Sequence, residues 1–150
     1  LHSFPTRRSS DLDLRNVAKL LKESGSYTGA LDLNYREFAR IYEFVNNVGD
    51  RHKHNCYLVM VTMNTLPEQL ADIEKIEKAL DCMEQSIRSK IRKVDVCTRY
   101  SSMQYLIILF EPQENQIPNV MERIFMHYYE LCDREDFKPQ YEYIKMTEPK

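Results

Sequence analysis

Residues 95–110, DVCTRYSSMQYLIILF, constrain the fold of this chain more than any other segment. Asp95 to Tyr100 and Gln104 to Glu111 both carry the β-branched, aromatic and aliphatic residues that are typical of strands, and a few polar residues separate them. A connection this short allows only antiparallel pairing. The segment therefore predicts a β-hairpin.

The rest of the chain after residue 55 alternates between helix and strand periods. The nearly continuous apolar run Cys56–Met63 predicts a central strand that is covered on both faces. Apolar stripes at helical spacing predict helices over 72–91 and 117–131, and 141–146 predicts a last strand. The order strand, helix, strand, strand, helix, strand indicates an α+β, ferredoxin-like fold with a mostly antiparallel sheet and helices packed on it.

One or two helices are predicted before this core. Residues 34–48 place apolar side chains at helical spacing, and Gly49 is expected to end that helix. A shorter helix is expected in the linker at 13–30, either as the end of a connector from an upstream domain or as a simple N-terminal cap. Its apolar stripe consists of Leu14, Val17, Leu20 and Leu21.

Residues 1–12, LHSFPTRRSSDL, resemble the conceptual translation of a sequencing adapter, so we expect a non-native or disordered leader. The alternative is a short, basic, serine-rich native tail, which would also be disordered. After the linker at 13–30, residues 31–150 have the length of one ordinary domain.

Charge and composition exclude several function classes. Lys and Arg number 21, Asp and Glu number 23, and the net charge of -2 disfavours nucleic acid and anionic membranes as partners. No apolar run approaches the roughly 18 residues of a membrane span, so we expect a cytoplasmic protein. All three glycines precede the first strong strand, which excludes a glycine-rich phosphate loop downstream. The four cysteines lack CxxC spacing and are expected to be reduced and structural: Cys56, Cys82, Cys97 and Cys132.

The hairpin resembles the catalytic hairpin of diguanylate cyclases, the GGDEF family. In that family an Asp precedes an Arg and an aromatic residue, the GGDEF signature follows, and aliphatic residues complete the second strand. Here Asp95, Arg99 and Tyr100 fit the frame. The signature positions themselves are degenerate: Ser101, Ser102, Met103, Gln104 and Tyr105.

Two further segments extend the resemblance across residues 31–131, and it implies a nucleotidyl-cyclase core. Asn34, Arg36 and Phe38 are similar to the family's opening LTGLxNRRxF segment. The family's first strand ends in an Asp-x-Asp that holds magnesium, whereas Thr62 and Asn64 stand at those positions here. The family's FKxxND segment and GH pair are also missing.

These replacements predict a domain without catalysis. Joining two GTP molecules requires metal ions, and hard divalent ions require carboxylate oxygens. Thr62, Asn64, Met103 and Gln104 supply none, and serines replace the glycines that admit the nucleotide. We therefore expect no metal, no cofactor and no enzyme activity. An active cyclase, or an enzyme of altered chemistry on the same scaffold, is the alternative.

Arg92 and Asp95 form an Arg-x-x-Asp, the spacing of the family's inhibitory site for its product, cyclic di-GMP. An Arg can clamp phosphate or a guanine edge, and an Asp can accept from guanine N–H groups. The resemblance thus allows a receptor for cyclic di-GMP or GTP. The competing interpretation is a solvated helix end followed by a turn-forming Asp.

The remaining candidate residues are weaker indications of a functional site. His52 and His54 resemble a metal pair but lie in a polar stretch without a carboxylate or thiolate partner. His127 has no visible base partner, and Ser101 or Ser102 would need a base to act as a nucleophile. We expect a regulatory or protein-interaction module of a bacterial signalling protein. Its partner is expected to be another protein, an upstream sensor or receiver domain, or a second copy of the chain.

Overall fold

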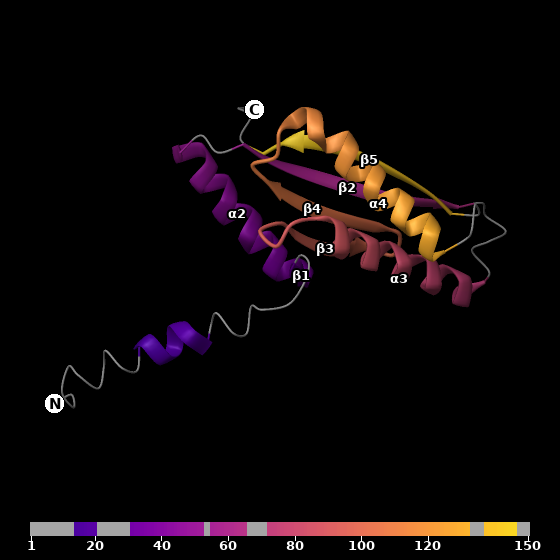
Figure 1. The fold of residues 1–150 in the computed structure, drawn as a ribbon, viewed down its shortest axis with the longest axis horizontal. Helices are drawn as coiled ribbons and strands as arrows, with labels where there is room; N and C mark the ends of the chain where they lie inside the picture. The colour runs from indigo at the N-terminus through magenta and orange to yellow at the C-terminus, as the bar shows by residue number, and fades with distance from the viewer. Residues whose placement is uncertain (1–13, 21–30, 53–54, 66–71, 133–136, 147–150) are drawn as a thin grey trace.

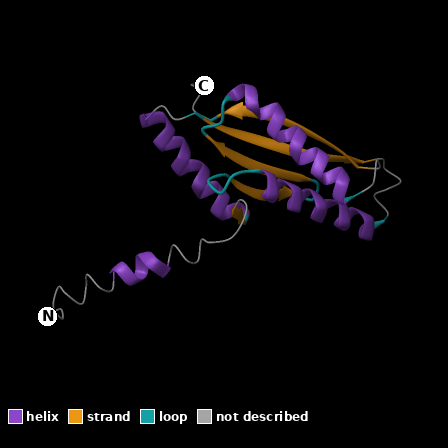
Figure 2. Ribbon diagram, viewed as in Figure 1, coloured by secondary structure: helices purple, strands orange, loops and turns teal. Residues whose placement is uncertain are grey.

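The computed structural model describes residues 14–20, 31–52, 55–65, 72–132 and 137–146 (Figure 1). These form a five-stranded sheet with the strand order β1-β3-β4-β2-β5, preceded by a short helix over residues 14–20. Helices α3 and α4 contact each other across one face of the sheet (Figure 2). The elements are β1 (Leu31–Leu33), α2 (Tyr35–His52), β2 (Cys56–Thr65), α3 (Ile73–Lys90), β3 (Val96–Ser101), β4 (Gln104–Phe110), the 3-10 turn η2 (Glu114–Gln116), α4 (Ile117–Leu131) and β5 (Phe137–Lys145).

The predicted α+β, ferredoxin-like order is confirmed. Strand β2 pairs antiparallel with both β4 and β5, and β3 pairs antiparallel with β4. The order β3-β4-β2-β5 is that of a split βαβ sheet, because β4 lies between the two strands that α3 connects. The sheet thereby brings the end of β2 beside the turn of the β3–β4 hairpin.

Strand β1 was not predicted. It pairs parallel with β3, with Leu31 opposite Val96 and Leu33 opposite Thr98. A strand of 3 residues is too short to show an alternating pattern in the sequence. Its pairing partner lies far along the chain, so only the assembled sheet defines it.

Helix α2 begins where the sequence predicts and ends later. The backbone N–H of Glu37 donates to Asn34 Oδ1 at 2.9 Å, and the N–H of Asn34 donates back to Glu37 Oε1 at 3.5 Å, which is a capping box. The expectation that Gly49 ends the helix is wrong, since α2 continues to His52. An interior glycine costs a helix only about 1 kcal/mol, which neighbouring turns can offset.

The two helices of the core agree closely with their predicted bounds. Asp72 caps α3 by accepting a hydrogen bond from the Lys75 backbone N–H at 3.1 Å. Helix α4 carries Pro118 in its first turn, where no intrahelical N–H is needed. Both helices therefore begin at residues that favour a helix N-terminus.

The last strand is longer than the sequence predicts, because it begins at Phe137 rather than Tyr141. The added part contains Pro139. Met146 N–H donates to the Cys56 carbonyl at 2.9 Å, so Met146 occupies a hydrogen-bonded position of the β2–β5 ladder. Bonded and non-bonded positions alternate along an antiparallel pair, and Pro139 is an odd number of residues from Met146. Pro139 therefore lies at a non-bonded position, where its missing N–H faces the sheet edge.

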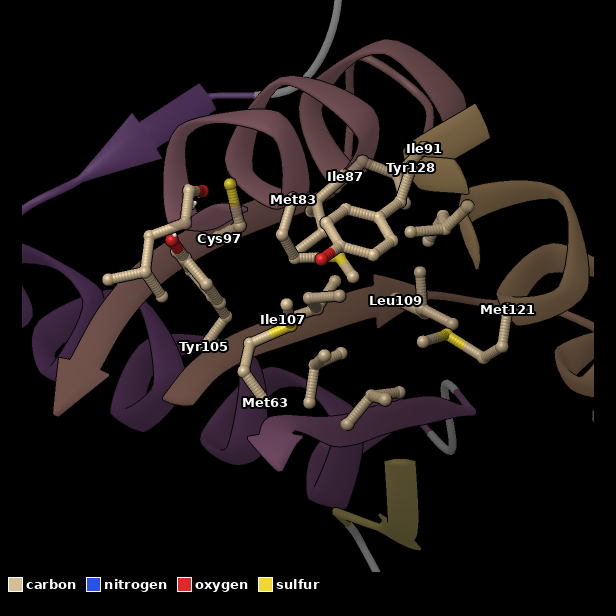
Figure 3. Close-up of a cluster of buried hydrophobic side chains, with 14 of the residues drawn as sticks. Met63, Met83, Ile87, Ile91, Cys97, Tyr105, Ile107, Leu109, Met121 and Tyr128 are labelled. Atoms are coloured by element: carbon tan, nitrogen blue, oxygen red, sulfur yellow. Dashed lines mark hydrogen bonds between the residues drawn. The ribbon is translucent and has the colours of Figure 1, made fainter. Parts of the chain in front are cut away.

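Two hydrophobic clusters lie on opposite faces of the sheet. On one face α3 and α4 bury side chains such as Met83, Ile87 and Tyr128, each with 0% exposure (Figure 3). On the other face α2 buries Phe38 and Val45 against a smaller cluster. Full burial of each large apolar side chain contributes roughly 1.5–3 kcal/mol. Of the helices that the structure describes, α2 alone packs on the second face, and a groove stays open between α2 and the sheet.

Candidate functional site

The polar turn between β3 and β4 lies beside the end of β2. The Met63 backbone N–H donates to the Met103 carbonyl at 2.8 Å, and Thr62 is paired with Gln104 in the β2–β4 register. Gln104 Nε2 donates to Thr62 Oγ1 at 3.3 Å. The structure thus brings together two of the predicted site positions that are 42 residues apart in sequence.

The side chains of this turn bond to one another. The Ser101 hydroxyl donates to Gln104 Oε1 at 2.9 Å. The Arg99 guanidinium donates to the carbonyls of Ser101 and Ser102 at 3.4 and 3.1 Å. The register between β3 and β4 shifts between Arg99 and Ser101, so Tyr100 occupies a bulge. The turn is fixed by neutral groups and one arginine.

Two of the predicted positions have other surroundings. Asn64 lies two residues beyond Thr62 on β2 and is exposed. Tyr105 is buried beneath α3, where its hydroxyl donates to the Leu80 carbonyl at 2.8 Å. Tyr105 therefore anchors the hairpin to the helix and does not face the turn.

The described side chains of this site are neutral apart from Arg99, and none of them is a carboxylate, thiolate or imidazole. Among the residues that the structure describes, no three His, Cys, Asp or Glu side chains gather where they could hold a metal ion. The side chains of Thr62 and Gln104 are neutral, and Gln104 donates a hydrogen bond to Thr62. Such groups can bind a ligand by hydrogen bonds, but they supply neither the charge nor the basicity that phosphoryl transfer requires.

Arg92 and Asp95 contact each other directly. The Asp95 carboxylate, which is only 1% exposed, accepts hydrogen bonds from the backbone N–H groups of Arg92 and Phe110 at 2.8 and 2.9 Å. The Arg92 guanidinium lies 3.4 Å from both Asp95 oxygens and also contacts the Phe110 carbonyl. The carboxylate therefore has structural partners, while the guanidinium is half-exposed.

Both residues border an open pocket of about 340 Å³ between the end of α3, the end of β4 and the start of α4. Lys90 and Arg123 also line this pocket, so three cationic side chains surround it. Glu111 forms part of the lining and has a left-handed backbone, with φ of 52°, which is uncommon for a residue other than glycine. The carboxylates of Asp95 and Glu111 line it too, and Asp95 pairs with Arg92, so the cations that face the pocket without that pairing are Lys90 and Arg123. Cationic groups of this kind can bind a phosphate or a purine edge.

Sequence reasoning did not find Lys90 or Arg123 as members of this pocket. Arg123 lies on α4, and only the packing of α4 beside α3 brings it near Arg92. No residue spacing in the sequence predicts that Arg123 lies near Arg92. Lys90 follows the helix-end pattern of basic residues, which the macrodipole favours in any helix.

His127 has a partner that the sequence did not show. Its Nδ1 lies 2.9 Å from the Ser86 hydroxyl, which itself donates to the Cys82 carbonyl at 2.8 Å. Ser86 has 0% exposure, so this pair links α3 to α4 and offers no nucleophile to a substrate. Of the other histidine candidates, His54 and the side chain of His52 lie outside the described residues.

Thiols and a phenol meet at the same helix interface. All four cysteines are free, as expected, and Cys56, Cys97 and Cys132 are buried. Burial raises the pKa of the Cys56 and Cys82 thiols. Burial is also the main cause of the raised pKa of Tyr128, and the Cys132 and Cys82 thiols raise it further. The raised pKa values of Cys56, Cys82 and Tyr128 favour the neutral form of these three groups.

No protein-family model and no curated protein matches the chain. Solved structures do match in fold. A diguanylate cyclase protein from Thermotoga maritima superimposes with a TM-score of 0.61 at 17% identity over 79% of this chain and 82% of its own. The diguanylate cyclase SiaD from Pseudomonas aeruginosa, solved with its activator SiaC, gives 0.65 at 18% identity over 92% of this chain.

The chain spans 57% of the length of SiaD. The coiled coil and GGDEF domain of DgcB from Caulobacter crescentus, solved with cyclic di-GMP, gives a TM-score of 0.55 at 11% identity over 91% of this chain and 78% of its own. The fold is therefore that of a GGDEF domain. Among the described helices, none has the length and apolarity that a membrane crossing requires.

Proposed function

We propose that this chain is a degenerate GGDEF domain that acts, without catalysis, as a regulatory or protein-interaction module of a bacterial signalling protein in the cytoplasm. The hydrogen-bonded pair of Thr62 and Gln104 carries the proposal. In the family that the sequence resembles, carboxylates stand at the metal-binding and signature positions. A neutral pair cannot hold the metal ions on which joining two GTP molecules depends.

The partner in this proposal is a protein: an upstream sensor or receiver domain, a separate activator or a second copy. The similarity to SiaD, which was solved with its activator, supports a protein partner. The balanced charge of the chain supports it too, because no basic surplus favours a polyanion.

Incubation of the purified chain with GTP and Mg²⁺ or Mn²⁺, followed by chromatography of the nucleotides, tests the absence of catalysis. We expect no cyclic di-GMP and no other product, while a competent diguanylate cyclase in a parallel reaction gives product. A metal-dependent product that disappears in Gln104→Ala would overturn the proposal. It would support an enzyme of altered chemistry at the hairpin instead.

A second candidate function is a receptor for cyclic di-GMP or GTP. The pocket that Lys90, Arg92 and Arg123 surround favours it, because guanidinium groups bind phosphate and guanine edges bidentately. Asp95 would act there by fixing the position of Arg92, since its oxygens already accept four hydrogen bonds.

Isothermal titration of the chain with cyclic di-GMP and with GTP tests the receptor. Arg123→Ala removes one cation of the pocket without touching the Arg92–Asp95 pair, and Arg92→Ala removes the second. Arg88→Ala, on the exposed part of the last turn of α3, is the matched control. Binding that is lost in both pocket variants and kept in the control supports the receptor. No heat with either nucleotide rejects it.

A further inference from the structure

An open apolar groove of about 190 Å³ lies between α2 and the sheet face that α2 partly covers. Tyr35, Ala39 and Tyr42 form its wall, because residues at these spacings share one side of the helix. Leu58 of β2 and Leu106 of β4 form its floor. We call this surface the α2 groove.

Exposed apolar side chains continue the groove at both ends. Ile144 of β5 is 59% exposed and lies opposite Leu58 in the β2–β5 register. At the other end Tyr35 is 54% exposed, and its ring centroid lies 5.7 Å from that of Tyr100. A contiguous exposed apolar surface of this kind marks a site of interaction.

The helix over residues 14–20 is a second unpartnered apolar surface on the same chain. Its three large apolar side chains, Leu14, Val17 and Leu20, are 68%, 48% and 63% exposed. Their spacing puts them on one side, while Arg15 and Lys19 lie on the other. A helix shorter than about 12 residues is marginal in water without a packing partner. This one therefore requires a surface to cover its apolar side.

We propose that the helix over residues 14–20 docks in the α2 groove of its own chain, with Leu14, Val17 and Leu20 against the groove. The lengths match: at about 1.5 Å per residue, the helix and the stretch of α2 from Tyr35 to Tyr42 each span about 10 Å. Ten residues, the number between the helix and β1, can span at most roughly 33 Å at about 3.3 Å per extended residue, which is several times the length of the groove wall. They join β1 just before Tyr35, at one end of the groove.

Docking in this orientation buries no charged side chain. With Leu14, Val17 and Leu20 against the groove, Arg15 and Lys19 on the opposite side of the helix stay in the solvent. Docking would connect any domain upstream of residue 14 to the sheet face that carries Thr62 and Gln104.

Hydrogen–deuterium exchange of the full chain tests the docking. We expect the amides of residues 14–20 to exchange at least tenfold more slowly than in an unstructured peptide. Val17→Asp on the helix and Ala39→Asp on the exposed groove wall should each abolish that protection. Asn16→Asp, which adds the same charge on the polar side of the helix, should retain it. Slow exchange of β2 and β4 in every variant shows that the fold is intact.

Three outcomes would overturn the proposal. Exchange of residues 14–20 at the unstructured rate in the unmodified chain shows that the helix has no partner. Protection that survives Ala39→Asp shows that the helix does not use the groove. Protection that falls on dilution, together with a dimer mass by light scattering, shows that the helix packs against a second copy.

Discussion

The carboxylate of Asp95 accepts a hydrogen bond from the backbone N–H of Phe110 at 2.9 Å, which joins two residues 15 positions apart at the open end of the β3–β4 hairpin. The same carboxylate accepts from the Arg92 backbone N–H at 2.8 Å. One buried side chain therefore holds the turn after α3 to the end of β4. Asp95 stabilises the fold whether or not the neighbouring pocket binds a nucleotide.

Asp95→Ala should lower the free energy of unfolding by about 2–3 kcal/mol, because it leaves two backbone N–H groups without their charged acceptor. Urea unfolding followed by circular dichroism measures the change. Asp81→Ala, at an exposed position of α3, is the control and should have little effect. Equal stability of the two variants would show that water replaces the carboxylate at this corner.

Two buried tyrosines should respond oppositely to removal of the hydroxyl. Tyr105→Phe loses the bond to the Leu80 carbonyl and should destabilise the chain by about 1 kcal/mol. Tyr128→Phe should be neutral or stabilise it by about 1 kcal/mol. The Tyr128 hydroxyl is buried, and the neighbour that acts on it is the Cys132 thiol, a weak hydrogen-bonding group that does not reach hydrogen-bond geometry with it. Paired urea titrations measure the difference, and a larger loss for Tyr128→Phe would contradict it.

Carboxylates placed at the hairpin site should create a metal-sensitive pair. In the double variant Thr62→Asp, Gln104→Glu, two like charges about 4 Å apart should cost about 1–4 kcal/mol of stability in EDTA. Mn²⁺ should restore much of that loss by bridging the oxygens. Thermal unfolding with and without Mn²⁺ measures the effect. Gln104→Glu alone should respond weakly, and an equal response of the single and double variants would argue against the proximity of the two positions.

Stability should fall as the pH rises above about 9. The pKa values of the Cys56 and Cys82 thiols are raised in the native state by burial, from 9.0. At a pH above 9 the unfolded chain therefore loses protons that the native state keeps, which favours unfolding. Urea unfolding at pH 8, 9 and 10 measures the slope. Cys56→Ala should make the slope shallower, and an unchanged slope would assign the effect to other groups.

Much of the fold follows from local patterns. The apolar run of β2, the stripes of α3 and α4 and the hairpin at 95–110 predict the elements and their order, because burial on one or both faces imposes a period on the residues. The errors lie where local signals are weak. Gly49 does not end α2, β1 is too short to show alternation, and Pro139 enters β5 because an edge position needs no N–H there.

The candidate site, too, is predicted from the sequence only in part. The sequence predicts that Thr62 and Gln104 occupy corresponding positions of a cyclase-like frame, and the register of β2 and β4 places them in hydrogen-bond contact. It also singles out Arg92 and Asp95. It does not show that Asp95 is buried and bonded to Phe110, or that Arg123 lies across the pocket.

Residue types at short range account for the element order, the helix starts near Asn34 and Asp72 and the neutral chemistry of the hairpin turn. Which distant groups meet depends on how the elements pack. The Ser86–His127 contact, the cationic pocket and the α2 groove all arise where α2, α3 and α4 pack on a twisted sheet. Contacts of this kind depend on packing between elements far apart in the chain, and the local hydrophobic periodicity of the sequence does not predict them.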